Sequence, residues 1–77
     1  MKELLEVIAK RLVDNPDVIT VTEKEGPRGT ILELRVAPDD MGKIIGKQGR
    51  IAKSIRVVMR AAAIHNNKFL SVDILPL

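Results

Sequence analysis

Apolar positions recur along the chain with two different periods, and these periods predict its secondary structure. From Lys2 to Val13 the spacing is helical, with one face formed by Leu4, Leu5, Ile8 and Leu12. Asp14-Asn15-Pro16 ends this helix, because proline cannot continue the hydrogen-bond ladder and biases the preceding residue away from helix. β-Branched, alternating residues then predict a strand from Val18 to Glu25, with Ile19 and Val21 facing inward.

The next segments are predicted to form a β-hairpin followed by a helix. Gly26-Pro27-Arg28-Gly29 has the composition of a tight turn. The strand from Thr30 to Ala37 alternates cleanly and should direct Leu32, Leu34 and Val36 to the core. Pro38 suits the first position of a helix, and Asp39 and Asp40 then lie in its positively polarised first turn. We expect this helix to be short and to end at Gly46.

A second, longer helix and a last strand are predicted for the rest of the chain. The helix runs from about Arg50 to Ile64, and Asn66-Asn67 closes it. Its expected apolar stripe consists of Ile51, Ile55, Val58, Met59 and Ala62. The strand from Lys68 to Leu75 should direct Leu70, Val72 and Ile74 to one side.

These elements follow one another in the order α-β-β-α-α-β, which predicts an α+β fold. The two strands that flank the helix pair are joined by a long crossover, so we expect them to be parallel, whereas the hairpin strands are antiparallel. The prediction is therefore a three-stranded mixed sheet that three helices cover on one face.

Composition narrows the class of protein. The 77 residues are 45% hydrophobic and 30% charged, which is typical of a single soluble globular domain. The absence of cysteine and the presence of one histidine exclude a disulfide scaffold and argue against a metal site, so we expect no cofactor. No apolar run is long enough to cross a bilayer, and acids interrupt Met1–Glu6 where a signal peptide would be apolar. We therefore expect a cytoplasmic protein that does not engage membranes.

Positive charge is concentrated in one segment. Between Met41 and Val72 the chain has seven bases and no acid, whereas the rest has six bases and ten acids, so +7 here and −4 elsewhere give the net charge of +3. The seven bases are Lys43, Lys47, Arg50, Lys53, Arg56, Arg60 and Lys68. This distribution favours a polyanionic partner, with nucleic acid ahead of a membrane surface. With one Phe and no Trp or Tyr, the chain has no aromatic platform on which bases could stack.

The segment Gly42–Arg50 contains three glycines between the two predicted helices. We expect Gly46 to take the left-handed conformation that ends a helix, and Gly49 to let a phosphodiester backbone approach the main chain. The amides that open the second helix lack intrahelical partners and carry about half a positive charge, which makes an anion site. A mid-helix glycine costs about 1 kcal/mol relative to alanine, so Gly42 predicts a neighbour that requires its small size.

The motif Gly42-Lys43-Ile44-Ile45-Gly46-Lys47-Gln48-Gly49, followed by a basic helix, resembles the GxxG segment of KH domains. The element order is that of the prokaryotic type II KH fold, and the resemblance covers residues 1–77 as a single KH domain. It is closest to the KhpA family of small bacterial proteins that consist of one KH domain. Ala52 departs from the pattern, because many KH domains carry a larger aliphatic residue there.

The resemblance implies that the chain binds single-stranded RNA. In this family Gly46 to Gly49 would clamp the backbone of about four nucleotides, and Ile44 or Ile45, Ala52 and the last strand would form an apolar groove, with Asn66-Asn67-Lys68 along its far edge. The resemblance also implies a homodimer or a heterodimer with the larger KH-containing protein KhpB, and a role as RNA chaperone or post-transcriptional regulator in cell elongation and envelope growth. The predicted RNA-binding residues are Lys43, Ile45, Gly46, Lys47, Gln48, Gly49, Arg50 and Lys53.

Other interpretations of these residues stay open at this point. Gly46 and Gly49 could form only a tight connection between helices, and Arg56 and Arg60 could lie on a solvated helix face or make secondary phosphate contacts. For Asp39 and Asp40 a helix-capping role is preferred to acid-base chemistry, and His65 is expected at the surface. The sequence offers no nucleophile-base pair, nucleotide-binding loop or small-molecule site, so an enzyme is the weakest class. The alternative function is a KH-fold interaction module that acts in ribosome assembly or protein binding.

Overall fold

A computed structural model of the chain describes residues 1–66 and 68–77, and for Lys47 and Gln48 it describes the backbone but not the side chains. The elements are α1 (Lys2–Leu12), the short 3-10 helix η1 (Pro16–Val18), β1 (Thr20–Gly26), β2 (Gly29–Val36), α2 (Pro38–His65) and β3 (Leu70–Pro76). The predicted helices and strands are confirmed within a few residues at their ends. The exception is the start of the first strand, because Pro16 to Val18 form a 3-10 turn in which the Val18 amide donates to the Asn15 carbonyl oxygen.

The three strands form a mixed sheet in the order β1-β2-β3. β1 and β2 are antiparallel and meet at a tight turn where Gly26 pairs with Gly29, whereas β2 and β3 are parallel, with Thr30 opposite Leu70. The parallel pairing confirms the predicted crossover through α2. Because β3 pairs on one side only, its other side is a free edge of the sheet.

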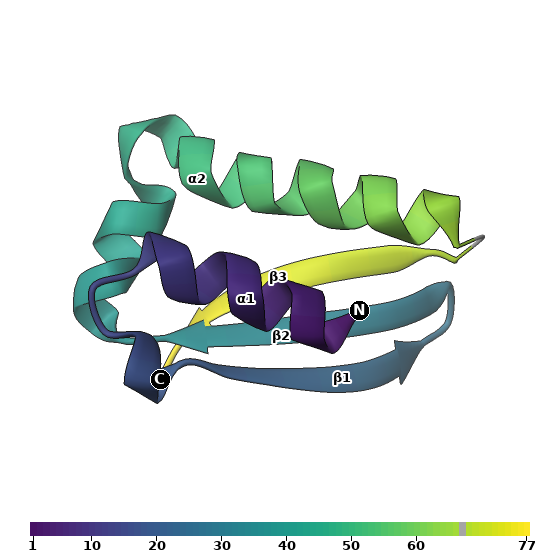
Figure 1. Cartoon of the computed structure of the whole chain (residues 1–77), viewed down its shortest axis with the longest axis horizontal. Coiled ribbons are helices and arrows are strands. Elements are labelled where there is room, and N and C mark those ends of the chain that lie inside the picture. Colours follow the sequence, from purple (N-terminus) through teal and green to yellow (C-terminus); the bar gives the residue numbers. More distant parts are fainter. Residues whose placement is uncertain (67) are drawn as a thin grey trace.

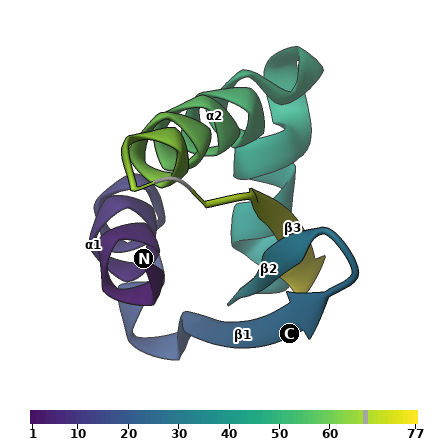
Figure 2. The ribbon, with the colours of Figure 1, turned by 90° about the vertical axis from the view of Figure 1, so that its right-hand side faces the viewer.

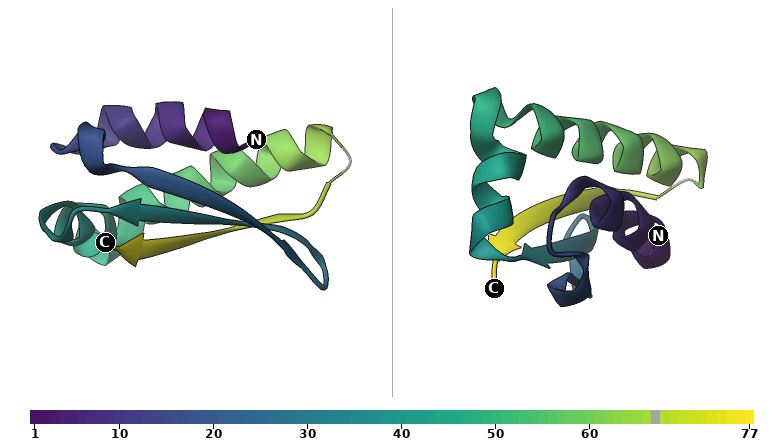
Figure 3. Two further views of the ribbon diagram at one scale, coloured as in Figure 1. Left: turned by 90° about the horizontal axis from the view of Figure 1, so that it is seen from below. Right: turned by 60° about the vertical axis from the view of Figure 1, so that its left-hand side comes forward.

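Both helices lie on the same side of the sheet (Figures 1 and 2). α2 changes direction sharply part-way along its length (Figure 3), and Gly49 has a φ of +68°, which is left-handed rather than α-helical. We call residues 38–48 the first arm of α2 and residues 50–65 its second arm. These two arms correspond to the two helices predicted from the sequence, so the α-β-β-α-α-β order is confirmed.

The core lies between the sheet and the helices. Its largest fully buried side chains are Leu5, Leu32, Leu34, Val36, Ile44, Ile55, Met59 and Asp40. Two predicted core residues are exposed instead, Leu4 at 39% and Val58 at 47%. Two alanines on the same helices are buried, since Ala9 on α1 is 0% exposed and Ala63 on α2 is 1% exposed.

The opposite face of the sheet is polar. Glu33 on β2 forms ion pairs with Lys24 on β1 at 3.8 Å and with Arg35 at 3.7 Å. Neither α1 nor α2 combines the length and the apolar content that a membrane-spanning helix needs, as far as the described residues show.

Candidate nucleic-acid interface

Gly49 sets the geometry of the site because it forms the bend in α2. Its φ of +68° is accessible to glycine without a Cβ clash. The prediction that Gly46 takes this left-handed conformation is wrong, since the φ of Gly46 lies outside that region. The chain keeps its helical course through Gly46 and turns three residues later, so the left-handed residue lies at the start of the second arm.

The space beside the three glycines of α2 is open. Apart from its chain neighbours and the adjacent backbone of α2 itself, a Cβ atom added to Gly42, Gly46 or Gly49 would meet no described atom within 4 Å. By contrast, a Cβ on Gly29 of the hairpin would lie 2.6 Å from the carbonyl oxygen of Phe69. The neighbour predicted to require the small size of Gly42 is therefore absent from the described chain. Close packing of the chain itself explains the hairpin glycine but not the glycines of α2.

A groove of about 470 Å³ runs beside the bend, between the second arm of α2 and β3. Its lining residues are Ile45, Gly49, Ala52, Lys53, Arg56, Val57, Arg60 and Ile74. Of the two isoleucines considered from the sequence, Ile44 is fully buried in the core, whereas Ile45 is 50% exposed and lines the groove. Ala52 and Ile74 supply apolar surface, and Lys53, Arg56 and Arg60 supply positive charge.

The basic side chains of the second arm form no ion pair within the described part of the chain. Within the described residues, no carboxylate lies at ion-pair distance from Arg50, Lys53, Arg56 or Arg60. The guanidinium of Arg56 contacts the sheet, since its Nε donates a hydrogen bond of 3.2 Å to the carbonyl oxygen of Val72. The side of α2 that faces the edge of β3 therefore carries a row of uncompensated cations above an apolar floor.

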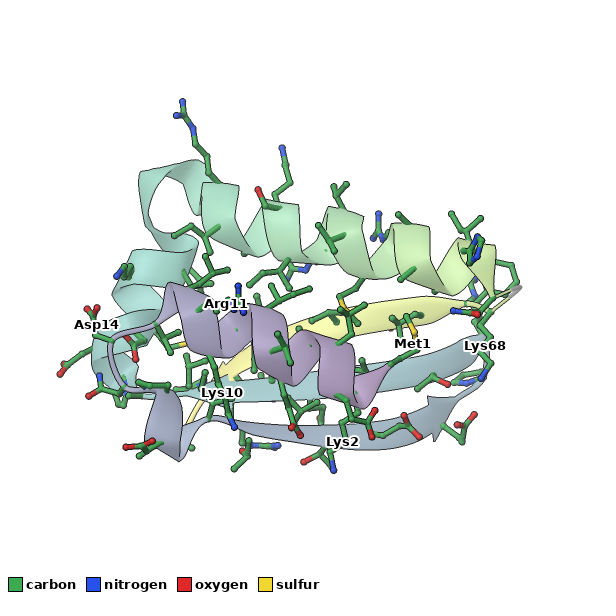
Figure 4. All side chains as sticks on the ribbon, viewed as in Figure 1. Met1, Lys2, Lys10, Arg11, Asp14 and Lys68 are labelled. Carbon is green, nitrogen blue, oxygen red and sulfur yellow. The ribbon has the colours of Figure 1, made fainter. Side chains whose placement is uncertain are left out.

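Lys43 lies on the first arm and points to the other side of the structure. Its Nζ is 3.1 Å from Oδ1 of Asp14, on the loop that follows α1. Figure 4 shows Asp14 at the end of the molecule opposite Met1 and Lys68. Lys43 does not line the groove, so the structure separates it from Ile45, Gly49 and Lys53. The side chains of Lys47 and Gln48, which the sequence places in the same site, are outside the described part of the chain, as is the whole of Asn67.

Asp40 fixes the first arm to the same loop. Its carboxylate is 1% exposed and accepts hydrogen bonds from the amides of Asp14 at 3.0 Å and Asn15 at 3.1 Å, and from the Asn15 side chain at 3.1 Å. The Asp14 amide is the main reason that the pKa of Asp40 lies below its ordinary value of 3.8. Asp39 and Asp40 do lie in the first turn of α2, but Asp40 binds the loop rather than capping its own helix.

A second hollow, of about 410 Å³, lies at the opposite end of the sheet. It is lined by the hairpin residues from Gly26 to Ile31 and by Phe69, Leu70 and Ser71. Phe69 is 80% exposed, and Arg28 is the one charged residue among those lining the hollow. This hollow contains none of the residues predicted for RNA binding, so the groove beside Gly49 is the stronger candidate.

Comparison with known proteins identifies the family. The family model described as "KhpA/KhpB, KH domain" matches residues 2–74. The chain belongs to this family of KH domains. Among curated relatives, the RNA-binding protein KhpA of Clostridium acetobutylicum is 61% identical over 97% of this chain and 100% of its own length. The RNA-binding protein KhpA of Aquifex aeolicus is 45% identical over 97% of this chain and 95% of its own length. No solved structure matches the chain.

Membership of the KhpA/KhpB family confirms the resemblance and the fold that the sequence predicted. Both interpretations of Arg56 and Arg60 given above agree with the structure, because the two side chains are exposed on the second arm and also line the groove. Their spacing already indicated a shared position, since Lys53, Arg56 and Arg60 recur at helical intervals and must share one side of the second arm. What the sequence did not show is that this side faces the edge of β3.

Proposed function

We propose that this chain binds single-stranded RNA in the groove beside Gly49. The observation that carries the proposal is the open space at Gly46 and Gly49, which adjoins a row of cations that have no carboxylate partner among the described residues. An RNA backbone needs close access to main-chain amides and compensation for its phosphates, and these two features supply both. The names of the curated relatives, which describe them as RNA-binding proteins, support the same function.

The proposed contacts divide between phosphate and base. The amides of the first turn after Gly49, with Lys47, Gln48 and Arg50, bind the phosphates at the bend. Ile45 approaches the bases from the first arm, and the apolar floor of Ala52 and Ile74 contacts them inside the groove. Lys53 adds charge along the rim. Lys43 contributes least, because Asp14 already compensates it.

The GxxG loop of a KH domain clamps about four nucleotides, and such a footprint gives weak binding with little sequence choice. Weak, general binding suits an RNA chaperone or post-transcriptional regulator in the cytoplasm. We extend the proposal to the cellular role that the family resemblance suggests, in cell elongation and envelope growth. An enzymatic activity is not part of this proposal.

We further propose that the chain acts as a dimer, because linking two grooves raises their combined affinity for RNA. Exposed apolar residues near the end of the second arm support this, since Ile64 is 73% exposed and Ala61, three positions earlier on the same side, is exposed too. These two residues form one stripe outside the groove lining. The partner is a second copy of this chain or a larger, KhpB-like protein.

Changing Lys47 and Gln48 together to Asp tests the proposed function. The change keeps both glycines and moves the local side-chain charge from +1 to −2. Each new acid about 6 Å from a phosphate costs about 0.7 to 3 kcal/mol of binding, so the double variant should lose its affinity for a single-stranded RNA octamer in fluorescence anisotropy. An unchanged circular dichroism spectrum is the control for folding. Normal RNA binding by the folded double variant would rule out the bend as the RNA site.

The alternative function is an interaction module for protein binding or ribosome assembly. The salt dependence of the binding affinity distinguishes it from binding to single-stranded RNA. About three phosphate contacts predict a slope near −2 in a plot of log affinity against log salt concentration for a single strand. An apolar contact with protein responds weakly to salt. A slope near zero for the partner that binds at the groove would favour the protein-binding module.

A further inference from the structure

The guanidinium of Arg56 is held in place by the edge of the sheet. Its Nε donates to the carbonyl oxygen of Val72 at 3.2 Å, on the side of β3 that has no neighbouring strand. An arginine side chain normally samples many rotamers, and fixing them costs free energy when a ligand binds. The bond to Val72 fixes the plane of the guanidinium before any ligand arrives.

This anchor uses one of five N–H donors and leaves the two Nη groups available. Within the described residues, Nε to Val72 is the only hydrogen bond that the Arg56 side chain makes, and no carboxylate pairs with it. Arg56 lines the groove between Ala52 and Arg60. A planar pair of donors therefore stands at a fixed position above the apolar floor, where the proposed function places the bases.

Donor geometry decides which base edge can bind there. The Nη groups form a fork that matches two adjacent acceptors. Guanine offers such a pair at O6 and N7, and cytosine offers one at O2 and N3. On adenine the amino donor lies beside both N1 and N7, and N3 has no second acceptor next to it. The Watson–Crick edge of uracil places an N–H between its two oxygens, so neither base presents the matching pair.

We propose that Arg56, anchored on Val72, forms a base-recognition subsite that selects a nucleotide whose edge carries two adjacent acceptors, namely guanine or cytosine. This inference rests on the proposed RNA binding and adds a selectivity that the small groove alone does not supply. A phosphate also accepts from an arginine fork. The position of Arg56 favours a base, because its side chain is drawn to the edge strand beside apolar residues instead of extending toward the bend.

Arg60 provides a matched control on the same helix. It lines the same groove and carries the same charge, but within the described residues its guanidinium makes no hydrogen bond to the sheet. Arg56→Lys keeps the charge and removes the anchored fork, and Arg60→Lys makes the same chemical change at the position without an anchor. A difference between the two variants therefore reports the anchored fork rather than the charge.

The experiment measures affinities for four labelled RNA octamers by fluorescence anisotropy. One octamer is all uridine, and the other three carry a single cytidine, guanosine or adenosine at the fourth position. The wild-type chain should bind the cytidine or the guanosine octamer about 10-fold more tightly than the other two, within the range of one bidentate contact. Arg56→Lys should abolish this preference, and Arg60→Lys should retain it.

A change on the RNA makes the test independent of any effect of substitution on folding. Replacing the preferred base by 7-deazaguanosine or 3-deazacytidine removes one of its two acceptors, and the wild-type preference should disappear. The subsite is overturned if the wild type binds all four octamers equally, or if Arg56→Lys keeps the preference. If the wild type binds none of the octamers, the proposed RNA-binding function itself is wrong, and the subsite with it.

Discussion

The Nζ atom of Lys43 lies 3.1 Å from Oδ1 of Asp14 and joins the first arm of α2 to the loop after α1. Asp40, one turn earlier on the same arm, accepts three hydrogen bonds from that loop. The first arm is therefore fixed from the side that faces away from the groove. This arrangement assigns Lys43 and Asp40 to holding the bend in position and leaves the groove side to Ile45, Gly49 and Lys53.

The two lysines that flank the bend should therefore differ in their effect on RNA binding. Lys53→Ala removes a cation from the groove and should reduce the salt slope from about −2 to about −1.4, the change expected for one phosphate contact. Lys43→Ala should leave the slope unchanged and cost less than about 1 kcal/mol of folding stability, because the ion pair is exposed. Affinities measured across a salt series check both. A larger loss of slope in Lys43→Ala than in Lys53→Ala would contradict this assignment.

Asp40 makes the stability of the fold depend on pH. Its pKa in the folded chain is lowered, chiefly by the Asp14 amide, so its stabilising effect is complete above the ordinary value of 3.8 and is lost as the pH falls through the folded pKa. Asp40→Asn should lower the Tm at pH 7 by on the order of 10 °C. The gap between variant and wild type should narrow as the pH falls below 3.8. Thermal melts followed by circular dichroism across pH 2 to 7, a range chosen to span roughly the acid titration, check this.

Asp39→Asn is the control for the Asp40 variant. Asp39 is its exposed neighbour in the first turn of α2. If both variants lost the same stability, a general charge effect of the first turn would explain the result, and the hydrogen bonds to the loop would not.

The two glycines at the bend should respond differently to alanine. Gly46→Ala places a methyl group in open space on helical backbone, so stability should be unchanged or rise by up to about 1 kcal/mol. Gly49→Ala forces a Cβ into the left-handed region and should cost about 1 to 2 kcal/mol. RNA binding should weaken in both, because the methyl group occupies space proposed for the RNA backbone. Urea unfolding measures the effect on stability, and fluorescence anisotropy measures the effect on RNA affinity. A stable Gly46→Ala variant with full affinity would argue against a close approach of RNA to Gly46.

The exposed stripe on the second arm predicts the oligomeric state. Ile64→Lys should convert a dimer to a monomer in light scattering without lowering the Tm, because the side chain is 73% exposed and supports no core contact. Val18→Lys is the matched control, since Val18 is 43% exposed but lies on η1, away from the stripe. A wild-type chain that is monomeric at all concentrations would remove the dimer from the proposal.

The sequence was sufficient to predict the secondary-structure elements and the strand pairing. The alternation of apolar and polar residues in β2 and the long crossover before β3 leave few other arrangements of the strands. It was less reliable for the choice of core residues on a helix. Val58 was expected in the core from its hydrophobicity, but its side chain is 47% exposed, whereas Ala63 on the same arm is 1% exposed. Likewise, the spacing of Gly46 and Gly49 predicted a turn between helices without showing which of them takes the left-handed φ.

The sequence predicted the glycine motif of the candidate site, but it did not predict which of the site residues lie on one surface. Ile45, Gly49 and Lys53 meet in the groove as expected, whereas Lys43 belongs to the opposite side. Its partner, Asp14, lies 29 positions away along the chain, and local patterns carry no information on such a pair. For the same reason the bond from Arg56 to Val72 could not be anticipated, since it depends on how α2 crosses the edge of the sheet.

The parallel pairing of β2 with β3 also sets the order of events during synthesis. One wall of the groove belongs to α2 and the other to β3, and β3 follows α2 in the chain. The hairpin of β1 and β2 contains mostly local contacts and can form early, whereas β3 must close a long loop before it docks. A nascent chain that has emerged only as far as α2 carries the glycines and the basic helix without a finished cleft, so the proposed binding of RNA in the groove would follow the docking of the last strand.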